Sequence, residues 1–231
     1  MHKDSSNFSV QRTNQSGNVL IYILIALALF GFLTLTIARM NVQNDNRNLN
    51  NERVELFKNE LIEFVASAGQ TVDMMTTTGV RIDEINLVKP DEAGYDEPTA
   101  NLNIRKLFHS EGGGLNYQSE PNENMMRPID GDSGWHYQNE INVEWTPSAE
   151  PELILTANQI NRAICERLNE SITGSTEIPV ISGTIREHFV EEGGNVDFTI
   201  ADCPECESYN SLCVANNSET AFAFYNILAQ Q

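Results

Sequence analysis

Runs of lysine and arginine are missing from this sequence. Its 231 residues contain only 14 basic residues against 33 acidic ones, which gives a formal net charge of −19 at pH 7. A nucleic-acid-binding protein needs clustered basic residues, so we expect no nucleic acid partner. Anionic lipid headgroups would repel such a chain, so any membrane attachment has to come from apolar insertion.

Motifs of catalysis and metal binding are also missing. No Gly-x-Ser-x-Gly elbow or His-Glu-x-x-His element occurs, and the glycines at 112–114 lack the Lys-Ser/Thr ending of a phosphate loop. The four histidines are scattered, and a calcium-loop start at 130–134 has Ile141 where a bidentate glutamate is required. We therefore expect no enzyme activity, no cofactor and no metal.

Charged residues are absent from the whole stretch between Arg12 and Arg39. Within it, residues 19–37 are almost continuously apolar and would form a helix of roughly 28 Å, close to the roughly 30 Å core of a bilayer. A cleaved signal peptide has a shorter apolar region and a better small-x-small site, so an anchor is the favoured interpretation. We expect the short N-terminal tail to stay inside and the long acidic domain to cross.

The pattern predicts four segments: a polar leader or cytoplasmic tail (1–17), a transmembrane helix (18–39), a membrane-exit segment with an amphipathic helix (40–78) and a globular exported domain (79–231). The asparagine-rich stretch 41–51 could bend the helix. Beyond it, apolar residues recur at helical spacing. They are Leu49, Val54, Phe57, Leu61, Phe64, Ala68 and Val72.

For the expected exported domain, the sequence predicts strands and loops with one further helix. Alternation over residues 135–145 predicts a strand, and apolar runs at 179–185, 196–201 and 221–229 predict others. Residues 157–172 predict a helix, with Thr156 or Asn158 as the N-cap and Gly174 beyond its end. The loops at 89–100 and 109–134 are long. The expected fold is α+β, with the long N-terminal helix packed on an antiparallel sheet.

All four cysteines lie in the last third of the chain, and in an oxidising compartment they should form disulfides. Three pairings are possible, and we favour Cys165 with Cys213 and Cys203 with Cys206. The first would close a loop of almost fifty residues, worth about 4 kcal/mol. Two alternatives stay open: a redox Cys-x-x-Cys pair, although the segment after Cys206 is short for a thioredoxin-like fold, and a four-thiolate zinc site.

The junction QSGNVLIYILIALALFGFLTLTIAR, residues 15–39, resembles the class III leader of type IV pilins and pseudopilins. The resemblance implies that a prepilin peptidase cleaves after Gly17, that Asn18 becomes the N-terminus, and that the apolar helix packs into a filament core. Asn18 stands where phenylalanine is usual. Tyr22 stands where a glutamate usually neutralises a neighbouring N-terminal amine.

A second likeness covers RKLFHSEGGGLNYQ at 105–118, NQINRAICERLN at 158–169 and SLCVANNSETAFAFYNILAQ at 211–230. These segments are similar to pilin-like membrane proteins of alphaproteobacteria. The likeness supports the pairing of Cys165 with Cys213, because both segments carry a cysteine there.

The expected function is a structural pilin-like or pseudopilin-like subunit that acts by helix packing and protein contacts. Its expected location is the inner membrane, with the C-terminal domain in the periplasm or outside the cell. Other pilin-like or envelope proteins, and a prepilin peptidase, are the expected partners. One alternative is a permanently anchored periplasmic binding module whose long loops recognise a ligand. A second is an anchored thiol-disulfide oxidoreductase that uses Cys203 and Cys206.

Overall fold

The structure is a computed structural model that describes residues 16–97, 102–119, 121, 125–129, 132–190 and 195–230, with the backbone alone at 16–21 and 30–50. Contacts divide the chain into two compact units, Met1–Asn51 and Glu52–Gln231. The elements are α1 (Ser16–Thr77), η1 (Ile82–Glu84), η2 (Asn103–Arg105), β1 (Gly134–Ile141), β2 (Glu152–Asn158), α2 (Arg162–Thr173), α3 (Ile185–Phe189), η3 (Pro204–Cys206), β3 (Ser211–Ala215) and β4 (Phe222–Ala229).

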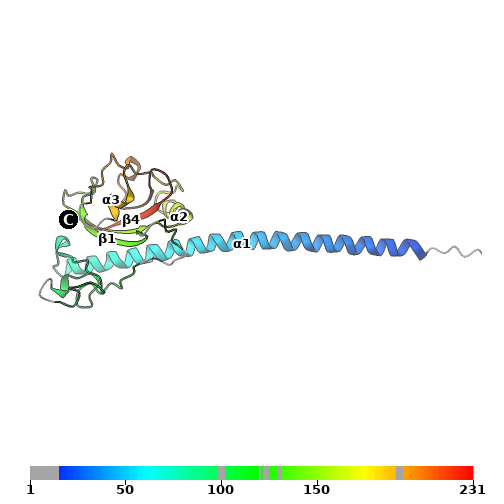
Figure 1. The fold of residues 1–231 in the computed structure, drawn as a ribbon, viewed down its shortest axis with the longest axis horizontal. Helices are drawn as coiled ribbons and strands as arrows, with labels where there is room; N and C mark the ends of the chain where they lie inside the picture. Colours follow the sequence, from blue (N-terminus) through cyan, green and yellow to red (C-terminus); the bar gives the residue numbers. More distant parts are fainter. Residues whose placement is uncertain are drawn as a thin grey trace, which may run out of the picture. The chain divides into compact units, whose positions relative to one another are not determined.

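Helix α1 begins at Ser16 and has 62 residues (Figure 1). Its helical backbone continues through the asparagine-rich stretch 41–51 without interruption. Asparagine is a weak helix former but does not forbid helix, so the unbroken hydrogen-bonded backbone is compatible with the composition.

In the second unit, α1 presents the amphipathic stripe that the sequence predicts. Leu61, Ala68 and Val72 are buried, and Val65 and Met75 belong to the same buried stripe. The ring centroids of Phe64 and Trp135 lie 4.8 Å apart, so the helix packs directly on the first strand of the sheet. The prediction of an amphipathic helix packed on a sheet is confirmed for this part of α1.

The four strands form one antiparallel sheet in the order β1-β2-β4-β3. The expected α+β class is therefore confirmed. β2 and β4 occupy the centre, and their pairing joins residue 153 to 229 at one end and 158 to 223 at the other. The C-terminal strand thus lies in the middle of the domain.

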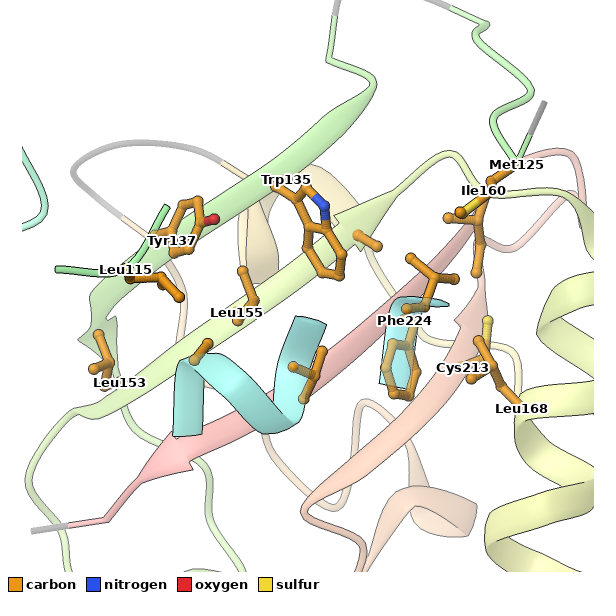
Figure 2. Close-up of a cluster of buried hydrophobic side chains, with 14 of the residues drawn as sticks. Leu115, Met125, Trp135, Tyr137, Leu153, Leu155, Ile160, Leu168, Cys213 and Phe224 are labelled. Carbon is orange, nitrogen blue, oxygen red and sulfur yellow. The ribbon is translucent and has the colours of Figure 1, made fainter. Parts of the chain in front are cut away.

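Side chains on the two faces of the sheet enter two separate cores. One core lies under the second-unit part of α1 and under α2, and Figure 2 shows several of its members: Trp135, Tyr137, Leu153, Leu155, Cys213 and Phe224. The other lies under α3 and the segment after it, and includes Ile154, Leu212, Val214, Ala223, Tyr225, Phe189 and Phe198. Alternate residues of each strand go to opposite cores, as the pleat requires.

The expected helix over 157–172 is wrong at its start. Ala157 and Asn158 belong to β2, all of whose residues are buried. The helix begins at Arg162, because the side chain of Asn161 accepts a hydrogen bond from the Ala163 N–H at 3.1 Å and caps it. A strand buried on both faces gives a continuous apolar run, which periodicity cannot distinguish from helix. The C-cap at Gly174, with φ of 80°, is as predicted.

Two of the predicted strands do not form, and a third is shorter than predicted. Residues 179–184 and 196–201 are connecting segments that make single bridges, Val180 with Ala215 and Val143 with Phe198, and Ile185 begins α3. β1 ends at Ile141, before the expected Trp145. The run at 221–229 does form a strand, β4, whereas β3 was not predicted. Short apolar runs fill the core from loops as readily as from strands, and only pairing partners decide between the two.

Glu152, the first residue of β2, is fully buried and closes the loop that follows β1. Its carboxylate accepts hydrogen bonds from the Val143 N–H at 2.8 Å and from the Thr146 hydroxyl. Burial raises the pKa of Glu152, and these hydrogen bonds oppose that rise only in part. The folded state therefore favours the protonated form.

A Glu152→Gln variant tests this through the pH dependence of stability. Because the folded pKa is raised, the proton on Glu152 stabilises the fold below its unfolded pKa, and this contribution is lost as pH rises through the folded pKa. The free energy of unfolding of the wild type should therefore rise relative to Glu152→Gln as pH falls from about 7 to about 4. Urea titrations followed by tryptophan fluorescence measure the free energy of unfolding of each variant at each pH. Exposed Glu140→Gln is the control, and a pH-independent difference for Glu152→Gln would contradict the argument.

Candidate functional site

The residues of the expected processing junction lie at the start of α1. Gly17 and Asn18 follow the first helical residue, Ser16, and their backbone is helical. Residues 1–15, which make up most of the expected leader, lie outside the described residues. Cleavage after Gly17 stays a prediction.

The apolar segment of α1 has side chains described at residues 22–29, and all of them are exposed in the single chain. Tyr22, Leu24 and Leu29 have 66%, 63% and 63% of their surface accessible. Consecutive residues of a helix point in all directions, so this segment is apolar all round. Within the part of the chain that the structure describes, no helix is long and apolar enough to span a membrane.

The structure places Cys165 of α2 and Cys213 of β3 in a disulfide, with their Cα atoms 5.4 Å apart. Both residues are fully buried. The pair lies at disulfide distance as the sequence analysis favours, and it ties α2 to the edge strand of the sheet.

Asn169 reinforces the same junction one helical turn further along α2. Its side-chain amide donates to the Cys213 carbonyl at 2.8 Å and accepts from the Cys213 N–H at 2.8 Å. The outer edge of β3 is covered further by hydrogen bonds between Ala215 and residues 179 and 181. An edge strand with satisfied backbone groups cannot pair with another chain. The sequence analysis missed Asn169, although its position four residues after Cys165 places both on one helix face.

Cys203 and Cys206 form the second disulfide, across η3, with Cα atoms 5.3 Å apart. Both are fully buried among the residues of the core under α3. Asp202 fixes the preceding turn by accepting hydrogen bonds from the Thr199 N–H and hydroxyl at 3.0 and 2.6 Å. Reactive cysteine pairs are partly exposed, so this burial supports a structural role over a redox one.

The two disulfides should differ in their effect on stability. Replacing Cys165 and Cys213 together with alanine should lower the free energy of unfolding by about 4 kcal/mol, because the bridge closes a long loop. The bridge between Cys203 and Cys206 closes a loop of only a few residues, so its double replacement should cost about 2 kcal/mol. Denaturant unfolding of the two double variants measures the difference. A larger loss for the short loop would contradict the loop-entropy explanation.

Each of the three described histidines has its own set of neighbours. His109 is 3.7 Å from Asp96, His136 pairs with the Asp132 carbonyl at 2.9 Å, and His188 packs against Phe198. Among the residues that the structure describes, no three of the types His, Cys, Asp and Glu gather where they could hold a metal ion. In the calcium-loop candidate, the Asp132 carboxylate pairs with Arg186, and residue 130 lies outside the described residues.

Lys106 was not singled out from the sequence, yet it is the most deeply buried cation of the described domain, with 1% of its surface exposed. Its ammonium donates to the carbonyl oxygens of Gly94, Tyr95 and Glu97 at 2.7, 2.6 and 3.3 Å. It also donates to the side-chain oxygen of Asn103 at 2.8 Å. A buried charge is tolerated when hydrogen bonds replace its water.

This lysine connects the two long loops, 89–100 and 109–134. Residues 94–97 belong to the first loop, and Lys106 itself precedes the second. Parallel pairing of Asn86 with Lys106 and the hydrogen bond from the Gly113 N–H to the Lys106 carbonyl add backbone links. Residues 94–97 of the first loop and Gly113 of the second are therefore both bonded to Lys106.

Replacing Lys106 with methionine, which has a similar length and no charge, should leave buried carbonyl oxygens without donors. We expect the free energy of unfolding to fall by about 3 kcal/mol. Thermal unfolding followed by circular dichroism measures the loss. Lys89→Met is the matched control, since Lys89 keeps 30% of its side-chain surface exposed and pairs with the exposed Glu92 at 3.3 Å, and it should change stability by less than about 1 kcal/mol. Equal losses of stability in the two variants would refute the role of the oxygen atoms that surround the Lys106 ammonium.

Comparisons of the chain with protein-family models, with curated proteins and with solved structures gave no match.

Proposed function

We propose that this protein is a structural pilin-like or pseudopilin-like subunit, anchored by the first part of α1 and acting through helix packing and protein contacts without catalysing a reaction. One observation carries the proposal. A single helix, α1, joins a segment that is apolar all round to an amphipathic segment that packs on an antiparallel sheet. This combination is what the pilin resemblance implies.

The apolar segment needs an apolar environment. Large side chains at residues 22–25, 27 and 29 expose half or more of their surface in the single chain. Burying one such side chain is worth about 1.5–3 kcal/mol. Lipid tails, or the equivalent helices of neighbouring subunits, would supply the cover, and residues 19–37 match a bilayer in length.

Charge and cysteines support export of the second unit. Residues 52–231 carry 31 acidic and 10 basic residues, whereas the tail 1–17, which precedes the apolar segment, carries 1 acidic and 2 basic ones. A short tail with an excess of basic residues stays on the cytoplasmic side, and a long domain crosses regardless of its charge. The two disulfides belong to an oxidising compartment such as the periplasm.

The N-terminus of the protein from native membranes tests this function. A processed pilin-like subunit should begin at Asn18 and lack the mass of the segment 1–17, as intact-mass spectrometry and N-terminal sequencing would show. Gly17→Leu should remain uncleaved, because the resemblance assigns Gly17 to the peptidase. The neighbouring Ser16→Ala variant is the control and should be cleaved like the wild type. A wild-type chain that keeps the segment 1–17 would contradict processing and favour the permanent anchor.

A further inference from the structure

A groove of about 460 Å³ lies where the two long loops meet in the second unit. Its lining residues come from both loops and are mostly aromatic or small: Pro90, Tyr95, Phe108, Ser110, Gly114, Leu115, Asn116 and Tyr117. We propose that this groove binds an extended, proline-containing segment of a partner protein that carries basic residues beside its prolines. The inference goes beyond the proposed function, because it applies to an anchored chain inside or outside a filament.

Hydrogen bonds within the protein already fix one wall of the groove in the single chain. The Tyr95 carbonyl accepts a hydrogen bond from the buried Lys106 ammonium at 2.6 Å, and the Tyr95 hydroxyl donates to the Phe108 carbonyl at 2.9 Å. Tyr95 is thus held at both its backbone and its side-chain end. A binding surface that is already ordered loses little entropy when a ligand binds.

Aromatic packing fixes the other wall. The Phe108 ring is 5% exposed and meets the rings of Tyr117 and Tyr137 edge-on, at centroid distances of 5.1 and 4.9 Å. Tyr95 and Tyr117 remain partly exposed along the groove. Aromatic-lined grooves recognise polyproline II segments, because the preformed left-handed helix presents flat proline rings at little entropic cost.

Charge selects the flanking residues of the ligand. Residues 89–97 carry four carboxylates, Asp91, Glu92, Asp96 and Glu97, against a single basic residue, Lys89. Asp96 has 88% of its side-chain surface exposed, and the second unit as a whole is strongly acidic. Complementary potentials speed encounter and exclude wrong partners. A basic segment is therefore favoured, whereas an anionic glycan or lipid headgroup is disfavoured.

Binding should be tested with the full-length protein in a neutral detergent. The probe is a fluorescently labelled peptide of leucine and proline that ends in two arginines, followed by fluorescence anisotropy. The same peptide ending in two glutamates tests the charge requirement. A neutral oligosaccharide of N-acetylglucosamine, added as a competitor, tests the other ligand class that stacks on tyrosine rings.

Two variants locate the site. Tyr117→Ala removes an aromatic wall and should weaken binding of the basic peptide about tenfold. Asp96→Lys removes the contact with His109 but changes a side chain that is 88% exposed. It should therefore leave the fold intact and weaken binding about threefold at low salt, with a smaller effect at high salt. Glu207→Lys makes the same charge change at an exposed residue next to η3, beside the core on the other face of the sheet. It is the matched control and should bind like the wild type.

The proposal holds if the basic peptide binds more tightly than the acidic one and if Asp96→Lys weakens binding more than Glu207→Lys. It is overturned if the basic peptide does not bind, if both peptides bind equally, or if the two lysine variants behave alike. Displacement of the peptide by the oligosaccharide, or binding of the oligosaccharide alone, would assign the groove to a saccharide and overturn it as well.

Discussion

The packing of α1 on the antiparallel sheet is the contact on which the rest of the second unit depends. A four-stranded sheet has two apolar faces, and each needs a cover. The stripe from Leu61 to Met75 covers one face together with α2, while α3 and the loop segments around Phe198 cover the other. Without the helix, Trp135 would lose its contact with Phe64, and the core on that face of the sheet would lose the whole stripe.

Because the same helix carries the apolar segment at residues 22–29, the domain and the proposed anchor are parts of one secondary-structure element. No flexible linker rich in glycine or proline separates them. The proposal of a pilin-like subunit rests on this continuity.

Polar groups inside the second unit occupy a few positions where they join elements that apolar packing alone would leave separate. Asn169 satisfies the edge of β3, Glu152 closes the loop after β1, and Lys106 gathers the carbonyl oxygens of a neighbouring loop. Each of these buried groups has partners at hydrogen-bond distance. Buried polar groups of this kind specify one arrangement of loops, because any other arrangement would leave them without partners.

The features that depend on local pattern could be predicted from the sequence alone. The apolar run at 19–37, the amphipathic stripe after it, the helix cap at Gly174 and the α+β class all follow from spacing and composition. The favoured cysteine pairs, Cys165 with Cys213 and Cys203 with Cys206, also agree with the distances in the structure. Periodicity reports which side of an element is apolar, so it identifies elements that are covered on one side.

Which apolar runs are strands, and which buried polar groups join elements, became clear from the folded domain. β2 is buried on both faces and lacks alternation, so the pattern of its last residues predicts a helix, whereas residues 179–184 and 196–201 contribute to a core from loops. The ammonium of Lys106 binds the carbonyl oxygens of Gly94, Tyr95 and Glu97, and so fixes the Tyr95 side of the groove. Backbone carbonyl oxygens have no signature in a sequence, so only the fold reveals which of them meet a given ammonium group.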